Sequence, residues 1–304
     1  MKDVEIGTIF LEQISKKRGN ALGFWFFRLF LRMGGLFAAY TLLYGVALHY
    51  WLFDGKAVKA ASAYLRRRFP ESSPLMIRLK CYRLFVSQGK QLVDRMAAFS
   101  GGADFNFRLL GQDNLEKLAN QQKGFVLLTA HAGNWQIAMT TLAGFKKKVY
   151  LVMLPEHNAA VKASLGISGE GDFIDTIPPG GAPGDILRMI KLLKEGHIVS
   201  FMGDRAYGAV SGSVDFLGEK AQFPLGAFAV AAAAKVPVAV LLASRVGYKL
   251  YDVDLTNIIT PVYEKGENKK SQLIRWSQMY ADILSAFFQQ KPYQCFLFYD
   301  VWKQ

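Results

Sequence analysis

The feature that most constrains the fold is an alternation of short apolar runs and helical patterns that starts at residue 125. The apolar runs are rich in β-branched residues, as strands are, and they cover residues 125–129, 149–154, 173–177, 198–202, 238–244 and 250–255. The spacing of apolar positions predicts helices over residues 135–142, 158–165, 185–194, 225–234 and 271–289. This order favours an α/β fold with a central, mostly parallel or mixed sheet flanked by helices.

The amino-terminal part of the chain has a different character. Residues 34–53 contain no Asp, Glu, Lys or Arg, and about 20 apolar residues are enough to cross a bilayer. Both flanks are basic, at residues 16–18 and 56–68, so the positive-inside rule gives no orientation. A helix in the headgroup layer, a re-entrant helix and a buried core helix remain alternatives. We expect residues 1–69 to form a membrane-associated segment that contains an apolar helix. Residues 70–304 are expected to form one catalytic domain.

The charge balance indicates an anionic partner. The chain has 37 Lys and Arg against 24 Asp and Glu, a formal net charge of +13. An anionic membrane surface and an acidic carrier protein both fit such an excess. Nucleic acid is not expected, because the sequence lacks zinc-finger spacing and an RNA-binding aromatic signature. The two cysteines, Cys81 and Cys295, lie far apart, which argues against a disulfide framework and fits a reducing compartment.

Polar residues follow three of the predicted strands at their carboxyl ends. His131 follows residues 125–129, Glu156 follows 149–154, and Asp204 and Arg205 follow 198–202. Ligands of parallel sheets gather at the carboxyl ends of the strands, so the three groups would share one edge if the strands are parallel neighbours. The non-functional alternatives are a surface salt bridge for Glu156 and a structural ion pair between Asp204 and Arg205.

His131 has the most informative neighbours. The segment 130–136 reads Ala-His-Ala-Gly-Asn-Trp-Gln and lies between a predicted strand and a predicted helix. An imidazole at such a turn can take a proton from a hydroxyl, and helix N–H groups nearby can stabilise an oxyanion. The sequence has no G-x-S-x-G, G-x-G-x-x-G, Walker or H-E-x-x-H motif, which argues against the chemistries that those motifs support.

Residues 130–135 resemble the H-x-G-N-W-E/D block of the bacterial lauroyl and myristoyl acyltransferases of lipid A biosynthesis, in the lysophospholipid acyltransferase-like superfamily. Residues 203–205, 214–219 and 223–226 are similar to later blocks of that family, and residues 298–302 to the tail of a predicted-acyltransferase branch. The resemblance covers nearly the whole chain. It implies acyl transfer from acyl carrier protein or acyl-coenzyme A to a hydroxyl of a membrane glycolipid or lysolipid. It also implies the cytoplasmic face of a bacterial inner membrane, with no metal or bound cofactor.

The resemblance also implies residue roles. His131 is the expected general base, with Gln136 and Asp204 in the catalytic group. The backbone N–H groups near Gly133 and Asn134 are expected to hold the oxyanion. Substrate binding is expected of Gly133, Asn134, Trp135, Glu156 and Arg205, and Arg205 is a candidate for holding an acceptor phosphate because guanidinium suits phosphate.

One position departs from the family pattern, because Gln136 stands where the family has an acid. An acid there would fix the histidine tautomer and stabilise the imidazolium, and glutamine carries no charge. Three explanations stay open. In the first, another acid, Asp204 or Glu156, takes the role of the family acid beside the histidine. In the second, the glutamine is an introduced change that inactivates the enzyme. In the third, the protein is a weak or non-catalytic member of the family. The last explanation gives the alternative function, a lipid- or partner-binding protein on an acyltransferase scaffold.

Overall fold

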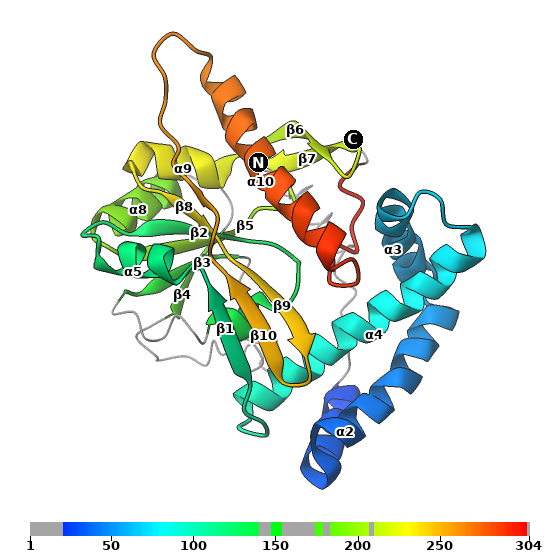
Figure 1. Ribbon diagram of the computed structural model, residues 1–304. Coiled ribbons are helices and arrows are strands. Elements are labelled where there is room, and N and C mark those ends of the chain that lie inside the picture. The colour runs from blue at the N-terminus through cyan, green and yellow to red at the C-terminus, as the bar shows by residue number, and fades with distance from the viewer. Residues whose placement is uncertain (1–20, 140–146, 154–173, 179–182, 207–209, 303–304) are drawn as a thin grey trace.

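A computed structural model describes residues 21–139, 147–153, 174–178, 183–206 and 210–302 of the 304-residue chain (Figure 1). Its centre is a six-stranded sheet in the order β11-β8-β2-β5-β3-β4. These strands are β11 (Ile258–Ile259), β8 (Val238–Val240), β2 (Phe125–Thr129), β5 (Ile198–Met202), β3 (Val149–Val152) and β4 (Ile174–Ile177). All neighbours pair in parallel except β11 with β8. The expected α/β architecture with a mostly parallel central sheet is therefore confirmed.

Two smaller sheets extend this centre. One has the order β1-β10-β9 and consists of β1 (Asn106–Leu110), β10 (Leu250–Asp254) and β9 (Leu242–Gly247). The other is the hairpin of β6 (Ser211–Phe216) and β7 (Glu219–Pro224). The single strand that the sequence predicts over residues 238–244 is interrupted at Leu241, whose N–H donates to the carbonyl of Leu128. The chain thus leaves the large sheet as β8 and enters the smaller one as β9.

Alternating residues of β2 enter two different cores, as the period of two in a strand requires. Val126 and Leu128 belong to the core formed with the helices α8 (Pro183–Lys194), α9 (Gly226–Ala234) and α10 (Lys269–Gln290). Phe125 and Leu127 belong to the core formed with α5 (Gln112–Asn120), β10 and α6 (Trp135–Met139). The central sheet is therefore covered on both faces, as its continuous apolar strands predict.

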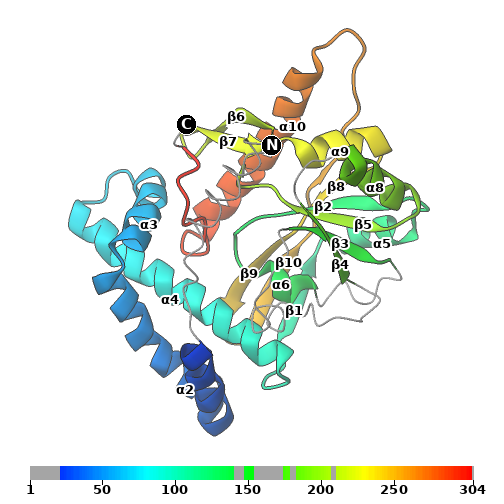
Figure 2. The same ribbon diagram turned by 180° about the vertical axis from the view of Figure 1, so that it is seen from behind.

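Three helices from the amino-terminal part lie together on one side of the sheet in both ribbon views (Figures 1 and 2). They are α2 (Ala21–Phe53), α3 (Gly55–Arg68) and α4 (Pro74–Phe99). The side chain of Asp54 caps α3, and that of Ser73 caps α4. Each cap satisfies a backbone N–H in the first turn of its helix, at the point where the chain turns from one helix to the next.

The apolar amino-terminal helix expected from the sequence is α2, and it is long and apolar enough to cross a membrane by length and composition. It bends at Gly34 and Gly35, whose backbone is not helical, and Gly35 has a φ of 61°. One face of the helix packs on α4 and buries Leu36, Ala39, Tyr40, Leu43 and Ala47. The opposite face leaves large apolar side chains exposed, among them Met33, Phe37, Leu48 and Phe53.

Most of the predicted helices are present with small shifts at their ends. The prediction over residues 158–165 lies outside the described residues, as do the last residues of the one over 135–142. The boundary expected near residue 69 stays a prediction. Strands β1, β6, β7 and β11 are not among the predicted strands. Burial alternates along β1 and β6, but their sequences mix polar, small and apolar residues, and β11 has only two residues.

The start of β2 gives a prediction for stability. A Cβ on Gly124 would lie 1.6 Å from the carbonyl oxygen of His197, at the point where β2 meets β5. We expect Gly124→Ala to lower the free energy of unfolding by about 1–3 kcal/mol, because overpacking forces the backbone to move. The matched control is Gly226→Ala, where nothing lies within 4 Å of the added carbon. Equal thermal unfolding midpoints for the two variants would contradict this account of the β2–β5 contact.

Candidate active site

The register of the central sheet brings His131 and Asp204 together. Thr129 and Met202, the last residues of β2 and β5, are partners in this parallel pair. His131 and Asp204 each follow their strand at the same distance along the chain, so they arrive side by side at the carboxyl edge. Gly203 allows the close approach, because a Cβ there would lie 2.7 Å from Leu128 Cδ1 and 2.8 Å from Tyr280 Cε1.

The Asp204 carboxylate binds His131 through both its ring and its backbone. His131 Nδ1 lies 3.0 Å from Asp204 Oδ1 and 3.2 Å from Oδ2. The backbone N–H of His131 donates to Oδ2 at 2.7 Å. A carboxylate at Nδ1 favours the tautomer that carries its proton there, which leaves the Nε2 lone pair available as a base. The carboxylate is almost fully buried, whereas the imidazole side chain keeps 26% of its surface exposed.

The surroundings set the charge states of this pair. Burial lowers the pKa of His131 below its ordinary value, and the nearby guanidinium of Arg205 acts in the same direction, while Asp204 partly opposes them. For Asp204, burial alone would raise the pKa. The imidazole, Arg205 and the His131 N–H outweigh burial and hold the pKa below its usual range. At neutral pH the site therefore combines an ionised carboxylate with a neutral imidazole that can accept a proton.

The turn after His131 is joined to the rest of the protein by its backbone. The N–H of Gly133 donates to the carbonyl of Gln294 at 2.9 Å, and the N–H of Asn134 donates to the carbonyl of Ala243 at 2.9 Å. Gly133 has a φ of 55°, and a Cβ there would lie 1.6 Å from the Ala243 oxygen. This differs from the expectation that these two N–H groups hold an oxyanion. Both already have acceptors, because the turn packs against β9 on one side and against the segment that contains Gln294 on the other.

The carboxyl-terminal segment 294–297 supports the turn from a second side. The N–H of Phe296 donates to the carbonyl of His131 at 2.7 Å. The guanidinium of Arg205 donates to the carbonyl of Phe296 at 2.8 Å and to that of Leu297. Arg205 thus lies beside the predicted site and joins this segment to it. Its expected contact with an acceptor phosphate stays a prediction.

The other expected site residues have different surroundings. Gln136 lies in α6 and is partly exposed, and among the described residues its side chain makes no hydrogen bond to His131. Trp135 packs against the core that contains α5. The buried side chain of Asn134 donates to the carbonyl of Gln91 at 2.9 Å. Glu156 lies outside the described residues. The binding roles of these residues therefore stay predictions.

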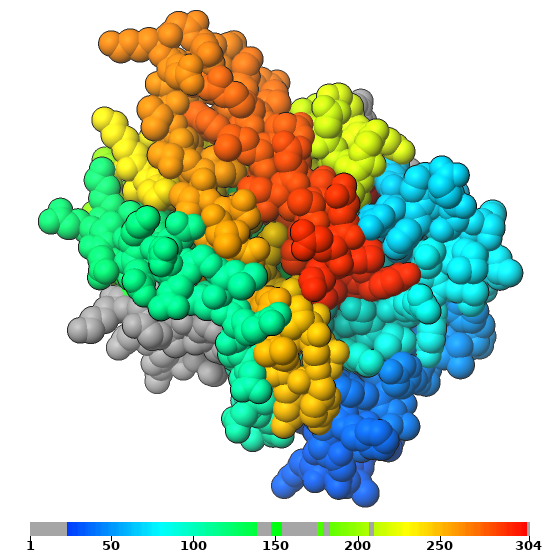
Figure 3. All heavy atoms as spheres, in the orientation of Figure 1, coloured from blue at the N-terminus to red at the C-terminus, as the bar shows by residue number. Residues whose placement is uncertain are grey.

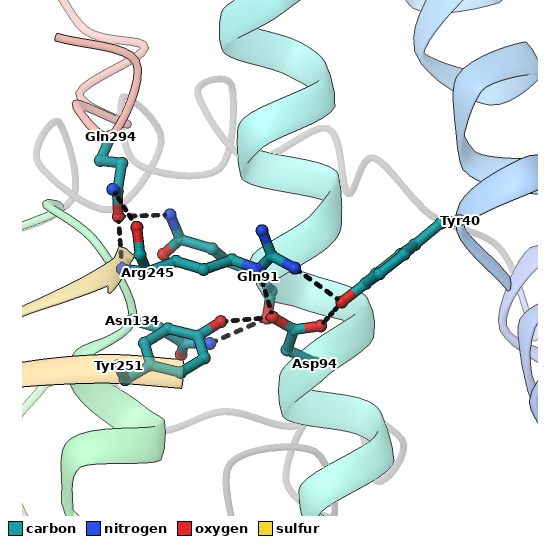
Figure 4. Close-up of polar contacts among 7 residues, drawn as sticks. All are labelled: Tyr40, Gln91, Asp94, Asn134, Arg245, Tyr251 and Gln294. Carbon is teal, nitrogen blue, oxygen red and sulfur yellow. Dashed lines mark hydrogen bonds and ion pairs between the residues drawn. The ribbon is translucent and has the colours of Figure 1, made fainter. Parts of the chain in front are cut away.

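Sequence reasoning missed a second polar cluster behind the turn, formed by Gln91, Asp94, Arg245 and Gln294 together with two tyrosines (Figure 4). None of these residues lies in a motif. A signal does exist in α4, because Gln91 and Asp94 continue the buried helical stripe of Ile77, Cys81 and Leu84. Polar side chains at such positions need buried partners, and that requirement could have drawn attention to them.

The charge states predict a titration. We expect the imidazole of His131 to titrate below 6.5, its ordinary value, and Asp204→Asn to move it lower still, because the carboxylate is what raises this pKa. Histidine ring signals in NMR spectra would measure both pKa values. Asp252→Asn, which removes the partly buried partner of the exposed Arg108, is the control and should leave the pKa of His131 unchanged. A pKa of His131 above 6.5, or one raised by Asp204→Asn, would contradict this electrostatic account.

Comparisons with known proteins add a family. A family model described as bacterial lipid A biosynthesis acyltransferase matches residues 91–304. Among solved structures, the chain is similar to the crystal structure of the 1-acyl-sn-glycerophosphate (LPA) acyltransferase PlsC from Thermotoga maritima. The identity is 14%, the alignment covers 83% of this chain and 94% of that chain, and the TM-score is 0.37. No curated protein matches this chain significantly.

Proposed function

This chain belongs to the bacterial lipid A biosynthesis acyltransferase family, and we propose that it transfers a fatty acyl group to a hydroxyl of a membrane glycolipid or lysolipid. The acyl donor in this proposal is a thioester on acyl carrier protein or coenzyme A. The proposed location is the cytoplasmic face of a bacterial inner membrane.

The observation that carries the proposal is the pairing of His131 with Asp204. The chemistry of this family needs a base that is uncharged, that carries its ring proton on Nδ1 so that Nε2 can accept a proton, and that is accessible to a substrate. The geometry supports each requirement in turn. The pKa of His131 is lowered, Asp204 binds Nδ1, and the imidazole is partly exposed.

The proposed reaction is a transfer of the acyl group from sulfur to oxygen. His131 Nε2 removes the proton of the acceptor hydroxyl as its oxygen attacks the thioester carbonyl. Asp204 stabilises the imidazolium that forms, and it stays ionised throughout. Collapse of the tetrahedral intermediate breaks the carbon–sulfur bond, and the imidazolium returns its proton to the leaving thiolate. The products are an ester and a free thiol, and His131 is neutral again.

The same pairing accounts for Gln136. Among the three explanations of this residue, the geometry favours the one in which another acid, Asp204, takes the place of the acid in the family block. An active enzyme therefore does not require a carboxylate at position 136. The alternative of a non-catalytic lipid-binding protein becomes an outcome of the experiment below.

The helices α2, α3 and α4 support membrane association. The exposed face of α2 carries apolar side chains, with Phe37 80% and Met33 77% exposed. Exposed basic residues lie on the same three helices, among them Arg28, Arg32, Lys56, Lys59 and Arg66. Apolar side chains beside basic ones bind an anionic lipid surface through burial and charge together.

The catalytic proposal predicts a graded series of variants. With acyl carrier protein or coenzyme A thioesters and lipid acceptors, we expect His131→Ala to reduce transfer to a small residual rate, as the loss of a triad residue does in serine proteases. Asp204→Asn should lower kcat by on the order of 10²–10⁴, since the acid-to-amide change in the serine protease triad lowers it by about 10⁴. Gln136→Glu should change kcat little, because the imidazole already has its carboxylate.

Two outcomes would overturn the assignment. Equal transfer by the wild type and His131→Ala would show that His131 is not the general base. A large gain in kcat on Gln136→Glu would show that Asp204 does not take the place of the acid in the family block. No transfer by any variant, with tight binding of the lipid, would favour the non-catalytic alternative. Asp252→Asn again serves as the matched acid-to-amide control.

The membrane proposal predicts a loss of binding when charge enters the exposed face of α2. We expect Met33→Glu with Phe37→Glu to reduce binding to vesicles that contain anionic lipid, because charged side chains do not partition into the acyl region. Val262→Glu is the control, since Val262 is 64% exposed and lies in the connection from β11 to α10. Cosedimentation measures both variants, and an equal effect of the two would contradict a lipid contact of α2.

A further inference from the structure

The carboxylate of Asp94 is fully buried on α4 at the centre of the second polar cluster (Figure 4). Arg245 Nε lies 2.9 Å from Asp94 Oδ2 in a buried ion pair, and Tyr251 donates its hydroxyl to the same oxygen at 2.6 Å. Tyr40 donates its hydroxyl to the other oxygen, Oδ1. Helix α4, strands β9 and β10 and helix α2 thus meet at one carboxylate.

A first chain of contacts connects Asp94 through Arg245 to residues 131–134, the turn that carries the proposed base and is called the catalytic turn below. The side chain of Arg245 pairs with Asp94, while its backbone is clamped by the Gln294 amide. Gln294 Oε1 accepts from the Arg245 N–H at 2.9 Å, and Gln294 Nε2 donates to the Arg245 carbonyl at 2.9 Å. The carbonyl of Gln294 then accepts the N–H of Gly133. Each step of this path is a direct hydrogen bond or ion pair.

A second path leads along α4 itself. Gln91 lies one turn before Asp94, and its side-chain amide donates to Gln294 Oε1 at 2.9 Å. The backbone carbonyl of Gln91 accepts from the Asn134 side chain at 2.9 Å. Both Gly133 and Asn134 are therefore held by the same cluster, and they lie two and three residues after His131, the proposed base.

The other end of the cluster is α2. Tyr40 lies on the face of α2 that packs against α4, and Arg245 Nη2 lies 3.3 Å from its hydroxyl. The exposed face of the same helix carries the apolar side chains of the proposed membrane contact. Tyr40 is thus the point where that helix touches the cluster behind the catalytic turn.

We propose that Asp94 is a positioning residue that couples the amino-terminal apolar helix to the catalytic turn, and that Tyr40 completes the coupling from α2. The proposal rests on the proposed function, in that its kinetic readout is acyl transfer. A buried charge is expensive to desolvate, and the loss of a partner leaves it uncompensated, so the partners of Asp94 are held in one arrangement around it. Here the arrangement fixed is that of residues 131–134 against α4, β9 and the carboxyl-terminal segment.

The kinetic test uses two variants and one matched control. Asp94→Asn removes the charge, and Tyr40→Phe removes only the hydroxyl that reaches it. We expect kcat to fall on the order of 10- to 100-fold for Asp94→Asn, since a displacement of about 1 Å can lower a rate 10²-fold. We expect a fall of about tenfold for Tyr40→Phe, with KM nearly unchanged in both. The control is Tyr82→Phe, because the Tyr82 hydroxyl also joins α4 to α2, at the carbonyl of Tyr44, but does not touch Asp94.

A spectroscopic test does not depend on transfer activity. The chain has four histidines, so labelled ring nitrogens can be assigned with the His131→Ala variant. We expect Asp94→Asn and Tyr40→Phe to shift the ring signals of folded His131, and Tyr82→Phe to leave them in place. Unshifted signals with a normal kcat in folded Tyr40→Phe and Asp94→Asn would overturn the proposal, even if both variants unfold at lower temperature. Shifted signals in a protein without transfer activity would support the coupling while excluding the proposed function.

Discussion

The hydrogen bonds between Asp204 and His131 are the constraint on which the rest of the site depends. A buried carboxylate is unfavourable unless its charge is compensated, and here the compensation comes from the imidazole, the His131 N–H and the nearby guanidinium of Arg205. The same contacts fix the tautomer of the imidazole. The parallel register of β2 and β5 is what makes the contacts possible, because it ends both strands at one level.

The backbone of the catalytic turn is fixed from three directions. Strand β9 accepts the N–H of Asn134, segment 294–297 accepts the N–H of Gly133 and donates to the carbonyl of His131, and α4 accepts from the Asn134 side chain. In the proposed reaction, a base held in such a frame loses little freedom when substrate arrives, which is the physical basis of preorganised catalysis. The same proposal requires an oxyanion to be stabilised by groups other than the N–H groups of Gly133 and Asn134, since both already have acceptors.

Much of this fold could be predicted from the sequence, because its central strands are continuous apolar runs and its helices have clear periodicity. Residues 125–129 and 198–202 have the same bounds as β2 and β5. The position of His131 at the carboxyl edge of the sheet could be predicted because it directly follows a strand. The position of Asp204 could be predicted by the same rule. The sequence could not show which acid meets the imidazole, because that depends on the register between strands 73 residues apart.

The second polar cluster could not be predicted from local sequence patterns for a similar reason. Asp94 lies more than 150 residues from Arg245 and from Tyr251 along the chain, and the packing of α4 across β9 and β10 brings it to them. Strands β1, β6, β7 and β11 are identified by their pairing with partner strands, because they are short and their sequences mix polar, small and apolar residues. In both cases tertiary pairing, not local propensity, decides the outcome.

The most direct measurement of the central claim is a double-mutant cycle on acyl transfer with His131→Ala, Asp204→Asn and the two changes combined. Residues that act as one catalytic unit are strongly non-additive. The account predicts that the combined variant is no slower than His131→Ala alone, because Asp204 acts only through the imidazole. Independent losses that multiply in the combined variant would show that the carboxylate does not work through His131, and would contradict the account.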